Sequence, residues 1–338
     1  MLGVCQVFIT SKDRIGVEEM EQQNNLGLDA SVPAVKQKSR FMKDILRDKY
    51  LYVLLLPGLL YLIIFKYLPM YGVVIAFKEY NIIMGIMESP WVGFQQFERL
   101  FRTPDFTQIF MNTLIISGLK LAVGFPAPII LALLLNELKN MPFKRITQSI
   151  VYLPHFISWV IFAGIIMAFL NPVDGLFNYI IKAFGGEPIG FLTSKEHFRS
   201  ILVISDVYKE IGWGTIIYLA AMTGVSPDLY EAARMDGAGK LKQMWHVTLP
   251  SIRPVVLIML ILSLGNVLEA GFLQIYLLYN PLVYDVADVI DTYVYRRGIQ
   301  EANYSLATAA GLFKSVIALI LIVTANKIVK KFGQEGLW

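Results

Sequence analysis

The residues of this sequence with the richest chemistry are polar and charged side chains that lie inside long apolar runs. A charge at the centre of a membrane helix costs about 2.5–3.5 kcal/mol, so such residues pair with one another or line a polar path. In the run 200–224, helical spacing places a set of residues on approximately one face: Asp206, Lys209, Glu210, Trp213 and Ile217. The candidates for a solute path, from this run and from the run 254–279, are Asp206, Glu210, Trp213, Asn266, Glu269 and Gln274.

Two interpretations of these residues stay open. In the first, the charges neutralise one another or reach the outer membrane interface, with Lys120 and Lys314 as further partners. In the second, these residues line the path of a solute: carboxylates and amides exchange hydrogen bonds with its polar groups, while Trp213 or Tyr218 offers a flat face to a ring. Glu269 would disfavour an acidic solute unless one of the two lysines balances its charge.

The elements that must position these residues are transmembrane helices. Hydrophobic residues make up 56% of the 338 residues and charged residues only 17%, whereas soluble domains have about 25% charged residues. A helix needs roughly 20 apolar residues to cross a bilayer. The sequence therefore predicts an all-α membrane protein with six spans, at 50–77, 106–138, 146–171, 200–224, 254–279 and 306–329.

Lysine and arginine in the short loops predict the orientation. Basic residues cluster before the first span, around residues 139–145, around 234–253 and after the last span, so both termini are expected on the cytoplasmic side. Residues 1–48 read as a polar, partly disordered cytoplasmic tail, and 49–338 as the membrane domain. In the last outer loop, an apolar stripe over 286–297 predicts an amphipathic helix that touches a partner or lies on the membrane.

The loop 224–250 predicts a helix-turn-helix on the cytoplasmic side. Ser226 is a good N-cap and Pro227 suits the first helical position, while Gly237 permits a sharp change of direction. A second helix follows, with Leu241, Met244, Trp245 and Thr248 along one face, and Pro250 is expected to end it. Such an element could dock into the groove of a partner or rest on its own bundle.

The residues of this loop resemble a known signature. Glu231-Ala232-Ala233, then Gly237 four positions on, then Val247, Leu249 and Pro250 have the complete spacing of the Glu-Ala-Ala motif of binding-protein-dependent ABC importer permeases. The segments 65–72, 124–128, 212–214 and 279–285 narrow the resemblance to the LplB-like oligosaccharide and polysaccharide branch. It covers roughly residues 49–338.

The resemblance implies a type I importer permease in the bacterial cell membrane that moves oligosaccharides or polysaccharide fragments by alternating access. It also implies its partners: a second homologous permease in a heterodimer, an ABC ATPase dimer that binds ATP and Mg, and an extracellular solute-binding protein. In that family the loop meets the ATPase and transmits its closure. The residues to which that coupling role carries over are Glu231, Ala232, Ala233, Asp236, Gly237, Leu249 and Pro250.

The sequence argues against an enzyme. The segment around Gly237 and Lys240 lacks the earlier glycine and the Ser/Thr of a phosphate-binding loop. Its three histidines are scattered and Cys5 is the single cysteine, so neither a metal site nor a bound cofactor is expected. The alternatives are a permease for another small solute and, from another class, a proton-coupled secondary carrier.

Overall fold

The computed structural model describes residues 49–331, and the N-terminal tail expected at 1–48 lies outside them. The chain divides into two units after Leu68. The described part of the first unit consists of α3 (Lys49–Leu62) and the π-helix η1 (Ile63–Tyr67), and neither buries a residue. Their exposed apolar side chains are suited to contact with lipid, in which a helix satisfies its own backbone hydrogen bonds.

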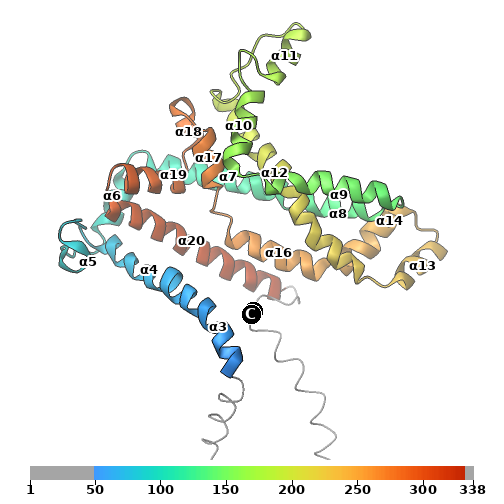
Figure 1. The fold of residues 1–338 in the computed structure, drawn as a ribbon, viewed down its shortest axis with the longest axis horizontal. Helices are drawn as coiled ribbons and strands as arrows, with labels where there is room; N and C mark the ends of the chain where they lie inside the picture. Colours follow the sequence, from blue (N-terminus) through green and yellow to red (C-terminus); the bar gives the residue numbers. More distant parts are fainter. Residues whose placement is uncertain (1–48, 332–338) are drawn as a thin grey trace, which may run out of the picture. The chain divides into compact units, whose positions relative to one another are not determined.

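The second unit, described over residues 69–331, is helical throughout, with one isolated β-bridge between Lys78 and Trp91 (Figure 1). The helices of its first half, after α4 (Leu68–Met70), are η2 (Tyr71–Phe77), α5 (Gly85–Glu88), α6 (Gln95–Arg102), α7 (Phe106–Gly124), α8 (Pro126–Asn136), α9 (Met141–Phe156), α10 (Trp159–Phe169) and α11 (Leu176–Ala183). Those of its second half are α12 (Lys195–Thr223), α13 (Pro227–Met235), α14 (Lys240–Gln243), η3 (Met244–Thr248), α15 (Leu249–Ser251), α16 (Arg253–Gly265), α17 (Phe272–Leu278), η4 (Pro281–Val283), α18 (Tyr284–Ala287), α19 (Ile290–Tyr295), η5 (Arg296–Gln300) and α20 (Tyr304–Lys331).

Three of the predicted spans are long and apolar enough to cross a membrane: Lys49–Phe77, Phe106–Asn136 and Tyr304–Lys331. Two bent helix pairs also qualify if each counts as one span, although the second pair includes residues of the loop expected at 224–250. The pair Met141–Phe156 and Trp159–Phe169 bends by 101°, and the pair Lys240–Ser251 and Arg253–Gly265 by 66°. The all-helical membrane architecture expected from the sequence is thus confirmed, with bends that the hydropathy pattern did not predict.

The remaining predicted span is α12, a continuous helix of 29 residues. It carries too many charges to resemble an apolar membrane span. Three helices, α7, α8 and α9, pack around it. It carries Lys195, Glu196, Arg199, Asp206, Lys209 and Glu210. A helix surrounded by others can carry such groups because its neighbours supply partners for them.

The fifth span, expected to be continuous over 254–279, is not. Helix α16 ends at Gly265, and Gly271 has a positive φ of 90° before α17 begins. Only glycine adopts this left-handed conformation without strain. The break places Asn266 and Glu269 on a turn, closed by the hydrogen bond from Glu269 N–H to Asn266 O at 2.9 Å, instead of on a helix face.

The apolar stripe of the last outer segment is also placed differently from the prediction. The chain breaks between α18 and α19, and Val289, Ile290 and Tyr293 are buried in two hydrophobic clusters of the bundle. The stripe is part of the core, so it is neither a membrane-surface helix nor a free docking face.

This outer segment is held by buried polar groups. Asn112, which is fully buried on α7, donates to the carbonyls of Asp285 and Asp288 and accepts from Arg199 of α12. Asp288 pairs with Arg296 at 2.5 Å. Burial lowers the pKa of Arg296, but the hydrogen bond and charge of Asp288 outweigh it, so the pKa is raised and Arg296 stays a cation.

Candidate functional site

Two glycines bring α12 unusually close to its neighbours. A Cβ on Gly212 would lie 2.1 Å from the carbonyl oxygen of Val151 on α9, and one on Gly214 would lie 2.9 Å from Cγ of Pro128 on α8. Helices that meet in lipid gain stability mainly from close packing, which small residues permit. The sequence Gly212-Trp213-Gly214 therefore seats α12 against two helices and leaves the tryptophan between the contacts.

Trp213 lies on an open face and stacks against His155 of α9. The two rings are 4.4 Å apart and nearly parallel, and the indole remains 46% exposed. His155 Nδ1 hydrogen-bonds the Glu210 carboxylate at 2.7 Å. The result is a flat aromatic surface with a carboxylate at its edge, a combination suited to a sugar ring and its hydroxyls.

Lys209 and Tyr218 of the same helix are both buried, although Tyr218 borders the hollow beside Trp213. Lys209 is buried and donates to the carbonyl of His155 at 2.8 Å, so it fixes the end of α9. Tyr218 is only 3% exposed and belongs to the apolar cluster of α8, α12 and α16, so its ring has no open face for a sugar. Ile217 is 40% exposed.

A hollow of about 270 Å³ lies beside Trp213 and Glu210, and a second of about 150 Å³ lies beside Asn266 and Glu269. Both hollows share four lining residues from three helices. The shared residues are Lys120, Leu121, Asp206 and Ser263. Five of the six predicted path residues therefore line two adjoining hollows.

Lys120 and Asp206 form the junction of the two hollows. Their ion pair, at 2.9 Å, joins α7 to α12, and Lys120 also hydrogen-bonds the Gln274 side-chain oxygen on α17. Gln274, the sixth predicted residue, is fully buried and donates to Leu202 O and Ser205 Oγ, so it supports Lys120 from behind and does not face the hollow. A Cβ on Gly271 would come within 2.6 Å of the Lys120 ammonium.

Glu269 stands apart from this pair. It is exposed and lines both the second hollow and a third of about 290 Å³, where Lys314 pairs with Asp291 at 2.6 Å. Among the described residues no ion pair reaches Glu269, since both lysines that could balance it are paired with aspartates.

The structure adds Ser117 and His155 to the residues that sequence reasoning named for the path. Ser117 lines the second hollow, and its buried hydroxyl has no hydrogen-bond partner among the described residues. No sequence signal marks either residue, because each reaches the path only through the packing of its helix on α12.

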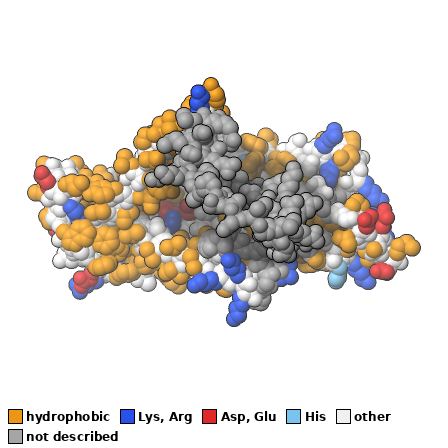
Figure 2. Space-filling model, turned by 90° about the horizontal axis from the view of Figure 1, so that it is seen from below, with side chains coloured by type: hydrophobic (Ala, Val, Ile, Leu, Met, Phe, Trp, Pro, Cys, Tyr) orange, Lys and Arg blue, Asp and Glu red, His pale blue; other side chains and the backbone are white. Residues whose placement is uncertain are grey.

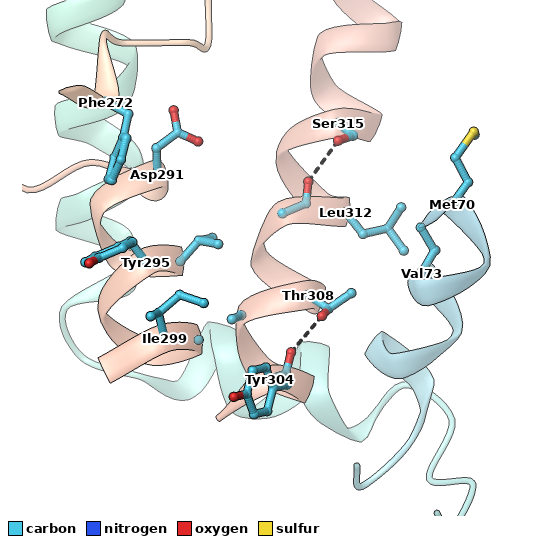
Figure 3. Close-up of a pocket in the computed structure, with 14 residues that line it drawn as sticks. Met70, Val73, Phe272, Asp291, Tyr295, Ile299, Tyr304, Thr308, Leu312 and Ser315 are labelled. Carbon is cyan, nitrogen blue, oxygen red and sulfur yellow. Dashed lines mark hydrogen bonds between the residues drawn. The ribbon is translucent and has the colours of Figure 1, made fainter. Parts of the chain in front are cut away.

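A larger hollow of about 890 Å³ lies between η2, α19 and α20 and is lined mostly by apolar side chains (Figure 3). Thr308 and Ser315, on its α20 wall, donate their hydroxyls to carbonyls of their own helix. Few polar atoms are left to face a hydrophilic solute, so this hollow fits lipid or an apolar protein surface better than a sugar.

The loop carrying the Glu-Ala-Ala pattern has the predicted helix-turn-helix form. Ser226 caps α13 by accepting from Asp228 N–H at 3.3 Å, and Gly237 turns the chain with a φ of 75°. The second helix runs through a π-helical stretch to Ser251, one residue beyond Pro250. Its predicted single face divides, because Met244 and Thr248 are buried whereas Leu241 and Trp245 are exposed.

The predicted coupling residues lie on the open side of this loop. Glu231, Ala232, Asp236 and Gly237 are exposed. A groove of about 510 Å³ runs between the two helices, lined by Leu229, Ala232, Ala233, Asp236, Ala238, Lys242, His246 and Val247. At the right of Figure 2, the end with α13 and α14 in Figure 1, charged side chains gather beside hydrophobic ones. Leu249 is half-buried against the apolar cluster of α8, α12 and α16, and Pro250 is exposed.

Residues 124–334 match the family described as binding-protein-dependent transport system inner membrane component. The chain belongs to this family. Members of it are transport subunits of membrane complexes rather than enzymes, as the sequence predicted. Among residues 49–331, no group of three or more His, Cys, Asp or Glu side chains could hold a metal ion.

Relatives with high identity cover nearly the whole permease. It is 47% identical over 92% of its length to the polygalacturonan/rhamnogalacturonan transport system permease protein YteP of Bacillus subtilis, covering 97% of that protein. It is 50% identical to Protein LplB of the same organism, again over 92% of its length and 98% of the relative. The predicted branch of the family is therefore confirmed.

A solved structure also matches the permease. A chain of a bacterial alginate ABC transporter, in complex with an alginate pentasaccharide-bound periplasmic protein, superposes with a TM-score of 0.82 at 44% identity. The match covers 88% of this permease and 100% of that chain. The fold is thus that of a type I ABC importer permease.

Proposed function

We propose that this permease moves fragments of an acidic polysaccharide through the two hollows that meet at Lys120 and Asp206. The observation that carries the proposal is the exposed Trp213 ring, stacked on His155 and edged by Glu210, inside a bundle whose relatives are named for saccharide transport. The alginate named for the solved structure is an acidic polysaccharide, which favours a substrate of the same class.

The proposed mechanism is alternating access driven by a separate ATPase. The groove of the Glu-Ala-Ala loop would receive an ABC ATPase that binds ATP and Mg, and a second homologous permease would complete the path. An extracellular binding protein would deliver the solute, as the periplasmic protein in the alginate transporter complex suggests. Both termini and the coupling loop would face the cytoplasm, where the basic loops of the sequence place them.

A neutral oligosaccharide is the second candidate, and Glu269 favours it. An exposed carboxylate without an ion pair in the described chain would repel a uronate unless a partner subunit supplies a cation. The relatives and Glu269 therefore point to different charge classes, which a direct uptake measurement separates.

The test is uptake by native cells of oligogalacturonides, an alginate pentasaccharide and maltopentaose. Acidic fragments should be taken up in an ATP-dependent manner, and Trp213→Ala should reduce uptake at least tenfold. Tyr208→Ala is the matched control, because Tyr208 is 60% exposed on the same helix and lines neither hollow. Uptake of maltopentaose alone would overturn the acidic class, and normal uptake by Trp213→Ala would overturn the proposed path.

A further inference from the structure

The two helices of the coupling loop are tied into one unit. The Tyr230 hydroxyl on α13 and Thr248 Oγ1 on the second helix are 3.0 Å apart, and Thr248 is buried. Across the turn, Ala238 N–H donates to Ala233 O at 2.9 Å, and Gln243 Nε2 donates to Ala238 O at 2.7 Å. A displacement of α13 therefore moves α14 with it.

One ion pair connects this unit to a helix that is distant in sequence. The Lys240 ammonium, at the first position of α14, pairs with the carboxylate of Glu137, the C-cap residue of α8. Glu137 is largely covered, with 20% of its side chain exposed, whereas Lys240 is 53% exposed. An ion pair this accessible adds little to the stability of a fold.

Local helix energetics explain neither of the two charges. The C-terminal end of a helix disfavours a carboxylate and the N-terminal end disfavours an ammonium, because each would meet a partial charge of its own sign. Glu137 and Lys240 both stand at the unfavourable end of their helices. Their mutual attraction offsets both penalties, so each residue makes physical sense only as half of the pair.

The far end of α8 reaches the candidate solute path. Pro128, in the first turn of α8, lies against Gly214, and its carbonyl accepts from the buried Thr215 hydroxyl at 3.2 Å. Gly214 and Thr215 directly follow Trp213 on α12. An α-helix is stiff along its axis, so a displacement at one end of α8 reaches the other end within about 16 Å.

We propose that the Lys240–Glu137 ion pair transmits movement of the coupling loop through α8 to the part of α12 that carries Trp213. The role of both residues is one of position, since neither touches solute or ATPase in this proposal, which rests on the proposed coupling function of the loop. Without the pair, the loop still docks and ATP is still hydrolysed, but α8 no longer follows the loop.

The test measures ATP hydrolysed per solute taken up by the complete importer, isolated from native membranes and reconstituted in liposomes. Lys240→Gln and Glu137→Gln should each raise this ratio at least threefold, and the two together should be no worse than either alone. Lys240→Arg and the charge exchange Lys240→Glu/Glu137→Lys should restore the ratio to within twofold of the original. Lys139→Gln, two positions from Glu137 and without an ion pair among the described residues, is the matched control.

A merely structural role would lower the amount of assembled importer and leave the ratio unchanged, which would overturn the proposal. The same holds if Lys240→Gln keeps the original ratio, or if the charge exchange fails to restore it. Gly237→Trp separates this proposal from the coupling function itself. If Gly237→Trp uncouples hydrolysis and Lys240→Gln does not, the loop couples by another route; if neither does, the coupling function of the loop is wrong.

Discussion

Replacing Gly212 by alanine tests the contact on which the arrangement around Trp213 depends. The added Cβ would lie 2.1 Å from a backbone oxygen of α9, whereas ordinary Cβ contacts begin near 3.4 Å, so the helices must part by about 1.3 Å. Overpacking of this kind costs about 1–3 kcal/mol. We expect the upper part of that range, because backbone atoms cannot rotate away as a side chain can.

A loss of about 2–3 kcal/mol lowers the ratio of folded to unfolded protein roughly 30- to 150-fold. Membrane proteins often unfold irreversibly, so the practical measure is the half-life of the monodisperse protein in detergent at a fixed elevated temperature. Gly212→Ala should shorten this half-life strongly. It should also reduce solute uptake, because the separation of α12 from α9 moves Trp213 away from His155.

Gly118→Ala is the matched control. Gly118 lies in α7 with nothing within 4 Å of an added Cβ, so alanine there should be neutral or slightly stabilising. A Gly212→Ala protein as long-lived and active as the original would refute the close contact of α12 with α9. Equal losses in both variants would mean that the effect does not come from this contact.

Two further predictions concern the coupling turn and the buried ion pair. Gly237→Ala should lower the stability of the turn by about 1–2 kcal/mol from its positive φ alone, and it should weaken binding of the purified ATPase. Gly239→Ala, at a φ of −69°, is the control and should do neither. Equal ATPase binding by both variants would contradict the role of the turn. Lys120→Met should cost about 3–5 kcal/mol, because it leaves Asp206 without its cation, and the yield of monodisperse protein should fall. Adding Asp206→Leu should recover yield but not uptake, and an undiminished yield of the single variant would show that the pair contributes little to the fold.

Much of the fold could be predicted because its signals are local. An apolar run of sufficient length must become a helix in a membrane, since lipid offers no partners to an open backbone. The cap at Ser226 and the turn at Gly237 are likewise set by the conformations and hydrogen bonds of a few adjacent residues. These features of the loop were predicted correctly, whereas the end of its second helix was misplaced by one residue.

The breaks inside spans are not visible in the hydropathy pattern. Hydropathy alone does not distinguish a continuous span from one broken after Gly265 or bent by 101° between α9 and α10. At both breaks, neighbouring residues satisfy backbone N–H groups. Asn266 N–H donates to Ser263 O at 3.2 Å, and Ser158 caps α10 after the bend by accepting from Ile161 N–H at 3.3 Å.

The sequence by itself determined that this chain is a helical membrane permease with a helix-turn-helix loop, because apolar run length and the spacing of a short motif are one-dimensional properties. Only the tertiary structure decided that Gln274 supports Lys120 from behind, that Trp213 stacks on His155, and that Lys240 meets Glu137. Each of these contacts joins residues more than 50 positions apart. Their partners are chosen by which helix faces meet, and that choice depends on how small residues such as Gly212 let the backbones approach.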